Sequence, residues 1–213
     1  MKPILFSTPM VLALLDGRKS QTRRIAKPQP SSGIRKSVFV KSGLEDGHGR
    51  EIKPRYQPSD ILWVRETWKC VQYDSMDGNL GYEVEFRDGE RKYFEFDDNE
   101  RFHQFGKFAF KEGWQSSLFM PREAARIFLR VKTVRVERLQ EITEEDARAE
   151  GVNGIPRSTV LYPNDDYIYP FKQLWNSLNQ KRSYGWDTNP WVWVIEFEKI
   201  SKEESEVEQD DKD

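Results

Sequence analysis

One stretch near the start of the chain brings together side chains that could do chemistry. From Gly17 to Lys36 the sequence has seven Lys/Arg and no Asp or Glu. Within it, Lys19 is followed three residues later by the hydroxyl of Thr22, and then by Arg23 and Arg24. The arginines suit a phosphate or carboxylate, which Arg binds through two parallel hydrogen bonds. The lysine and hydroxyl suit hydrolysis without a metal, in which a base activates a nucleophile.

Two interpretations are open for the lysine and the hydroxyl. Lys19 serves as a base only if its pKa falls well below the usual value of about 10.4. Like charge from Arg18, Arg23 and Arg24 would lower that pKa, and so would partial burial. Otherwise Lys19 is an exposed residue that the dipole of a preceding helix favours. Thr22 is either the nucleophile or an ordinary β-branched strand residue, and Lys19 could also activate a water instead of Thr22.

A carboxylate later in the chain is the third candidate for the same chemistry. Glu150 ends the segment from Thr143 to Gly151, which has the form of a helix opened by a capping box. The helix dipole opposes a carboxylate there, which favours a second role, such as shuttling a proton or holding Lys19. The alternative is a solvated residue in the last turn.

Other residues are candidates for binding a substrate. The basic pair suits an anion, but ion pairing of one arginine with Glu66 or Glu150 is the competing interpretation. An aromatic residue in a predicted strand either stacks on a base or packs in the core. The charged end of the predicted strand 61–66, Arg65 and Glu66, is expected to border the site of the basic stretch. The substrate-binding candidates are Arg23, Arg24, Trp63, Arg65 and Glu66.

Composition limits the class of protein. At 213 residues the chain suffices for one domain with a real core. The net charge of -2 hides an acidic end, because residues 201–213 hold seven acids and two lysines. The rest of the chain therefore has 32 Lys/Arg against 29 Asp/Glu and a charge of +3. A mildly basic chain with 13% aromatic residues suits a nucleoside or RNA partner.

Other classes are disfavoured. Cys70 is the single cysteine, so no disulfide framework can form within the chain, as is usual in a reducing cytosol. One cysteine and two histidines are too few for a structural zinc site, and no nucleotide-binding glycine motif is present. We expect no metal and no cofactor. Without a leader or a long apolar run, we expect a cytoplasmic protein that does not bind membranes.

Hydrophobic patterning predicts an α+β fold with mixed element order. We expect a short hairpin around residues 37–41, an insertion of strands and loops at about 68–117, and a disordered acidic tail over 201–213. A single domain would then occupy residues 1–200. The predicted strands are 2–7, 61–66, 82–86, 93–96, 127–139 and 191–200, with a further strand that ends near residue 25. The predicted helices are 10–15, 143–150 and 171–178.

Four segments in this order resemble the ASCH domain of the PUA-like superfamily, and most closely the ASCH proteins of phages and prophages. These segments are Gly17–Arg24, Pro58–Glu66, Thr143–Gly151 and Trp191–Phe197. The resemblance covers most of the chain but neither the insertion nor the loop at 152–169. It implies a small β-barrel flanked by helices, with a cleft for RNA or a nucleoside.

One small bacterial branch of that family hydrolyses the amide of N4-acetylcytidine. It uses a Lys and a Thr in a Gly-x-Lys-x-x-Thr stretch and a Glu at the end of a helix. Those positions are Lys19, Thr22 and Glu150 here, and Arg24 also matches. The resemblance implies a metal-independent amidohydrolase that acts on an acylated nucleoside. The alternatives are a non-catalytic RNA- or nucleotide-binding module and a metal-independent ribonuclease, for which no well-placed His supplies the acid.

Overall fold

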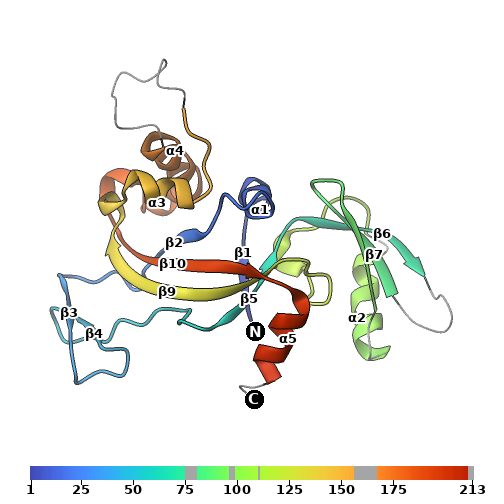
Figure 1. Cartoon of the computed structure of the whole chain (residues 1–213), viewed down its shortest axis with the longest axis horizontal. Coiled ribbons are helices and arrows are strands. Elements are labelled where there is room, and N and C mark those ends of the chain that lie inside the picture. The colour runs from blue at the N-terminus through green and yellow to red at the C-terminus, as the bar shows by residue number, and fades with distance from the viewer. Residues whose placement is uncertain (75–80, 96–98, 110, 156–166, 211–213) are drawn as a thin grey trace. The chain divides into compact units, whose positions relative to one another are not determined.

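The computed structural model describes residues 1–74, 81–95, 99–109, 111–155 and 167–210 of an α+β protein (Figure 1). The chain divides into two compact units. Unit 1 comprises Met1–Leu15, Ile61–Arg130 and Lys199–Asp213. Unit 2 comprises Asp16–Asp60 and Val131–Glu198. The stretch rich in candidate residues, from Gly17 to Lys36, therefore belongs to unit 2.

Unit 2 is built on β2 (Gln21–Ile25), β9 (Phe128–Arg138) and β10 (Trp191–Ile200) in the order β9-β10-β2. β2 pairs antiparallel with β10, and Thr22 lies opposite Ile195. Figure 1 shows β9 and β10 as two long neighbouring strands; each begins in one unit and ends in the other. The unit also has a hairpin of β3 (Ile34–Lys36) and β4 (Leu44–Asp46).

Two helices complete unit 2. α3 (Glu144–Ala149) opens with the predicted capping box, because Thr143 accepts from the Asp146 backbone and the Asp146 carboxylate accepts from the Thr143 backbone. α4 (Ile168–Asn179) follows the segment 156–166, so the predicted loop at 152–169 lies largely outside the described residues. Short 3-10 turns at Leu139–Glu141, Gln180–Arg182 and Trp186–Thr188 connect the elements. The apolar core joins the helices to β10 through Leu139, Ile142, Ala147, Phe171, Trp175, Val192 and Val194.

Unit 1 contains two sets of strands. β1 (Lys2–Leu5) pairs parallel with β5 (Ile61–Arg65), which pairs antiparallel with the start of β9. The second set is the antiparallel meander β6 (Trp68–Asp74), β7 (Gly81–Phe86) and β8 (Arg91–Glu95), which confirms the predicted hairpin in the insertion. The helices are α1 (Thr8–Leu15), α2 (Asn99–Ala109) and α5 (Lys202–Asp210), with a 3-10 turn at Ser117–Phe119.

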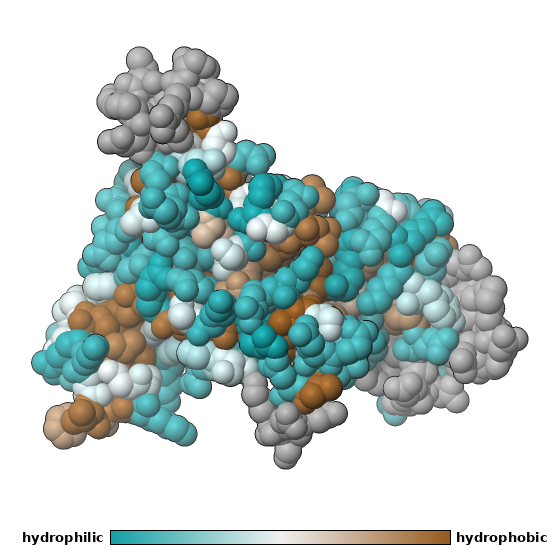
Figure 2. All heavy atoms as spheres, viewed as in Figure 1, coloured by the Kyte–Doolittle hydropathy of each residue, from teal (hydrophilic) through white to brown (hydrophobic). Residues whose placement is uncertain are grey.

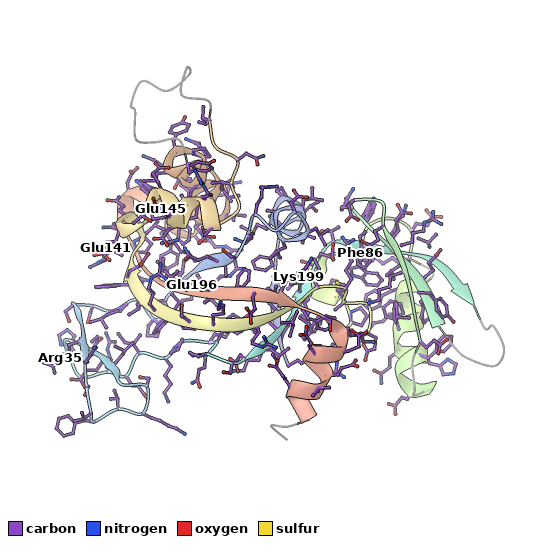
Figure 3. The ribbon with its side chains drawn as sticks, in the orientation of Figure 1. Arg35, Phe86, Glu141, Glu145, Glu196 and Lys199 are labelled. Atoms are coloured by element: carbon purple, nitrogen blue, oxygen red, sulfur yellow. The ribbon has the colours of Figure 1, made fainter. Side chains whose placement is uncertain are left out.

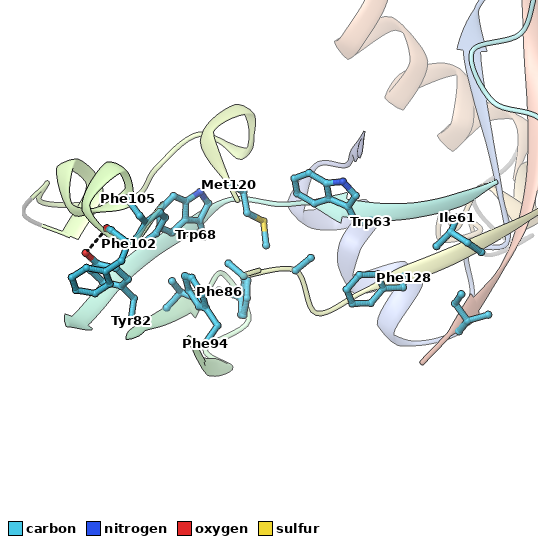
Figure 4. Packing of buried hydrophobic residues seen from close by; sticks show 14 residues of the cluster. Ile61, Trp63, Trp68, Tyr82, Phe86, Phe94, Phe102, Phe105, Met120 and Phe128 are labelled. Atoms are coloured by element: carbon cyan, nitrogen blue, oxygen red, sulfur yellow. Dashed lines mark hydrogen bonds between the residues drawn. The ribbon is translucent and has the colours of Figure 1, made fainter. Parts of the chain in front are cut away.

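Aromatic rings fill the interior of unit 1 beside the meander (Figure 4). Trp68 is fully buried and stacks on Phe105, with ring centroids 5.2 Å apart. Tyr82 stacks on Phe102 at 4.9 Å, and its hydroxyl donates to the Phe102 carbonyl at 3.1 Å. Phe102 and Phe105 lie three apart in α2, which is why one face of the helix delivers both rings.

Three features differ from the sequence-based expectation. The insertion contains α2, where only strands and loops were predicted, because the rings of this helix pack on Trp68 and Tyr82 of the meander, which no local pattern reveals. The described strands form open sheets of five, two and three strands, and none of these closes into a barrel. Residues 202–210 form α5, where a disordered tail was expected. Ser201 and Glu204 cap each other, and Ser205 is fully buried.

Candidate functional site

Lys19 precedes β2, where an isolated antiparallel bridge joins it to Glu150 at the end of α3. Next to it, the Ser20 backbone donates to the carbonyl of Ala149 at 2.9 Å, and the Ser20 carbonyl accepts from the Phe197 backbone at 2.9 Å. Lys19 is therefore held between the end of α3 and β10. This backbone pairing brings together two residues that lie 131 positions apart in the sequence.

The Lys19 ammonium is buried, with none of its side chain exposed. Nζ donates to the carbonyls of Gln21 at 2.7 Å and Glu150 at 2.8 Å, and to Oε2 of Glu150 at 3.0 Å. Burial lowers the pKa of Lys19 below 10.5, against the opposing effect of Glu150; the charges of Arg24 and Arg23 lower it further. The direction of this shift is the one that a lysine base requires.

Arg23 reaches the same carboxylate from β2. Its Nη1 donates to Oε1 of Glu150 at 3.3 Å, while Nη2 lies 2.6 Å from Glu137 and 3.0 Å from Asp146. The side chain of Arg23 is fully buried, and its guanidinium lies 5.8 Å from the Phe171 ring. Both oxygens of Glu150 thus face cations, so this carboxylate is fixed in orientation.

A second arginine extends the network outward. Arg135 on β9 donates to Glu137 at 3.1 Å and to Asp146 at 2.9 Å, and it pairs with Glu196, which is labelled on β10 in Figure 3. Burial raises the pKa of Asp146, but the charge of Arg23 and the Thr143 backbone hydrogen bond outweigh that effect and lower it. We name Lys19, Arg23, Glu137, Asp146 and Glu150 the buried ion network; Arg135 and Glu196, whose side chains are each 38% exposed, lie at its edge.

Thr22 and Arg24 lie on the other face of β2, because side chains alternate along a strand. Thr22 is 1% exposed. Burial lowers the pKa of Arg24. The charges of Glu150 and Tyr56 raise it, but by less, so the pKa stays below its usual value. Burial also raises the pKa of Tyr56, against the charges of Arg55 and Arg24. Arg24 therefore adds a fourth cation to the surroundings of the site.

The remaining predicted binding residues belong to unit 1. The Arg65 guanidinium lies 4.6 Å from the Trp63 ring, and Trp63 is 6% exposed. Glu66 accepts from Arg126 at 2.9 and 2.8 Å. Burial raises the pKa of Glu66, and the opposing effect of Arg126 is smaller, so the pKa lies above its usual value. These three residues make their contacts within unit 1, so the structure brings together Lys19, Arg23 and Glu150 but does not add Trp63, Arg65 or Glu66 to them.

The sequence analysis named Glu150 as a possible partner of one arginine, and Arg23 makes that pair, but it missed the two other acidic partners of Arg23, Glu137 and Asp146. Asp146 on α3 and Glu150 at its C-cap lie four apart and so share a face. Arg135 and Glu137 lie two apart on β9 and share a face of that strand. Both spacings can be read from the sequence, but nothing in the sequence indicates that Glu137 and Asp146 would pair with Arg23.

No protein-family model, no curated protein and no solved structure matches the chain. Among the residues that the structure describes, no three His, Cys, Asp or Glu side chains are grouped as ligands for a metal ion. Within the same residues, every helix is too short or too polar to cross a membrane.

Proposed function

We propose that the chain is a metal-independent amidohydrolase that acts on an acylated nucleoside such as N4-acetylcytidine, on a PUA-like fold of the ASCH type. The observation that carries the proposal is the buried contact of 3.0 Å between Lys19 and Glu150. The resemblance assigns these two residues to catalysis. Their contact joins a lysine of lowered pKa to a carboxylate that can hold it or exchange a proton with it.

The proposed reaction assigns a role to each residue. The step requires Thr22 to turn from the other face of β2 toward Lys19. Neutral Lys19 then takes the hydroxyl proton of Thr22, and the Thr22 oxygen bonds to the acetyl carbon. The C–N bond then breaks, and the amine nitrogen of cytidine takes the proton back from Lys19. Water hydrolyses the acetyl ester on Thr22 and releases acetate. Glu150 keeps Lys19 in place, and Arg23 keeps Glu150 in place.

One observation favours a non-catalytic role for the ion pair of Lys19 and Glu150, and so keeps the second candidate, an RNA- or nucleotide-binding module. Nζ of Lys19 donates to three protein acceptors, and none of its side chain is exposed. In this interpretation Lys19 and Glu150 are a structural ion pair that fixes β2 against α3. A structural pair stabilises the fold without any turnover of a substrate.

The test is hydrolysis of N4-acetylcytidine by the wild type and three variants, Lys19→Met, Thr22→Val and Glu150→Gln. We expect kcat/KM to fall at least about a hundredfold in the first two, since proton transfer by a positioned base contributes about 10²–10⁴-fold. The wild-type rate should rise with pH to a plateau, through a pKa below 10.5. Arg18→Gln and Ser20→Ala, at exposed neighbours, are the matched controls and should retain activity.

Each result decides between the candidates. Folded Thr22→Val without activity, beside active controls, supports the hydrolase. If pure wild type does not turn over acylated cytidines, the hydrolase proposal is wrong for this class of substrate, and the basic stretch is to be tested as an RNA-binding surface instead. Activity that survives in folded Lys19→Met removes Lys19 from the mechanism.

A further inference from the structure

The hairpin tip of unit 2, residues Lys36–Lys41, exposes apolar side chains at the end of β3–β4. Val38 and Phe39 are each 92% exposed, more than any other large hydrophobic residue that the structure describes. Figure 2 shows brown, apolar atoms at the end of this hairpin beside teal, hydrophilic ones. A phenyl ring in this position contributes nothing to the core, so its apolar surface is available to a partner.

Hydrogen bonds hold the base of the hairpin together and connect it to the tip. Asp46 is 2% exposed and accepts hydrogen bonds from the backbones of His48 at 2.9 Å and Arg50 at 3.0 Å. The Ser37 backbone donates to the carbonyl of Gly43 at 2.9 Å across the turn. Gly43 has φ of +74°, a conformation that favours glycine.

The charges of the hairpin separate into a neutral base and a positive tip. Residues 34–53 contain five Lys/Arg and three Asp/Glu, and each acid has a cationic partner within 2.8 Å. The pairs are Arg35–Glu45, Arg50–Asp46 and Lys53–Glu51, and Figure 3 labels Arg35 on this hairpin. The two other cations, Lys36 and Lys41, are exposed and flank the apolar residues, so the net charge of +2 lies at the tip.

We propose that the hairpin tip binds single-stranded nucleic acid. Phe39 stacks on an unpaired base, while Lys36 and Lys41 contact the phosphates on either side. Stacking needs only one ring per base, and cations that alternate with aromatic residues are how sequence-tolerant binders hold a strand. The proposal does not depend on hydrolysis, because these residues are separate from the buried ion network.

A membrane surface is the competing partner for an apolar tip with basic flanks. Stable membrane anchoring needs a large apolar area or a second anchoring signal. The tip offers a single ring and two valines, of which Val40 is half-buried. The charge and the single ring therefore favour a nucleic acid strand.

The test measures the affinity of the full chain for a labelled oligouridine of about 12 nucleotides, a length within the usual site sizes. We expect Phe39→Ala to weaken binding about 5- to 150-fold, since one stacked base contributes about 1–3 kcal/mol. We expect Lys36→Gln with Lys41→Gln to reduce the slope of log K against log salt by about 1.4, at about 0.7 per phosphate contact on a single strand.

Matched variants keep the test specific. Phe119→Ala changes another exposed Phe, and Lys111→Gln with Lys181→Gln removes two exposed lysines elsewhere. These should bind as the wild type does. The proposal is overturned if Phe39→Ala binds as tightly as wild type, or if the wild type binds phosphatidylserine vesicles and not the oligonucleotide. It is also overturned if sedimentation shows a dimer that Phe39→Ala dissociates, because a second copy then covers the tip.

Discussion

Charged side chains fill part of the interior of unit 2, whereas aromatic rings fill that of unit 1. In unit 2, the side chains of Lys19, Arg23 and Glu150 are 0%, 0% and 3% exposed. In unit 1, the interior beside the meander is filled by stacked rings such as Trp68 and Phe105. Rings gain free energy simply by leaving water. Buried charges first lose their free energy of hydration, and only well-aligned partners compensate for that loss.

The difference teaches where to look for chemistry. Burial of aromatic rings is favourable in itself, so the aromatic cluster of unit 1 requires no role beyond that of a hydrophobic core. A buried ion network costs more to assemble than an apolar core of equal volume. It also shifts pKa values, as it does for Lys19 and Asp146. Such shifts gather at functional sites, although structural networks also produce them.

The largest expected effect tests the aromatic side of the comparison. Trp68→Ala should lower the free energy of unfolding by about 3–5 kcal/mol, because it leaves a cavity in a packed core. Urea denaturation measures it. Leu118→Ala changes a residue that is 58% exposed and should cost within about 0.5 kcal/mol. Equal effects of the two variants would contradict a packed aromatic interior.

The next effect tests the charged side. Lys19→Met should cost about 3 kcal/mol, at the lower end of the range for breaking a buried pair, because Arg23 still holds Glu150. Lys19→Met combined with Glu150→Met should cost less than the sum of the single changes, since neither charge is then left alone. Additive costs in this double-mutant cycle would show that the two residues do not interact.

The smallest expected effect concerns the Asp46 carboxylate at the base of the hairpin of unit 2, and a change of pH reveals it. Burial raises the pKa of Asp46, but hydrogen bonds from Arg50 and His48 outweigh it and lower the pKa to about 2. The folded chain therefore holds the ionised form more tightly than the unfolded chain does. The stability that Asp46 contributes is fully present above its unfolded pKa of about 3.9 and is lost as the pH falls through about 2.

Asp46→Asn reveals this contribution. At neutral pH the variant should be less stable than the wild type in urea, and the difference should shrink between pH values of about 4 and 2. An NMR titration of the Asp46 carboxyl carbon measures the pKa directly. A midpoint near the unfolded value would mean that the hydrogen bonds of the hairpin base do not form in solution.

Local signals in the sequence predicted much of the fold. Alternating apolar residues indicated β10, and the capping box at Thr143 indicated the start of α3, because both depend on neighbours in the chain. The parallel pairing of β1 with β5 and the helix α2 were not predicted. The pairing of β1 with β5 depends on contacts between residues about sixty positions apart. Helix α2 is stabilised by rings that pack on the meander, so it depends on strands outside its own segment.

The candidate site was predictable in part for the same reason. The basic stretch around Lys19 is local and visible, and the resemblance singled out Glu150. The contacts of Arg23 with Glu137 and Asp146 depend on the register of β2, β9 and α3, which no local pattern encodes. Burial of the Lys19 side chain, which lowers its pKa, likewise comes from packing by distant segments.

Asp146 performs three tasks with one carboxylate. It accepts from the backbone at the start of its own helix, pairs with Arg23 and pairs with Arg135. A change to Asn would keep an acceptor for the helix but remove the charge. A change to Glu would keep the charge but move it by one methylene from the position that the helix start requires. Few single substitutions satisfy all three demands, so this position should tolerate little variation during evolution even though its carboxylate takes no part in the proposed reaction.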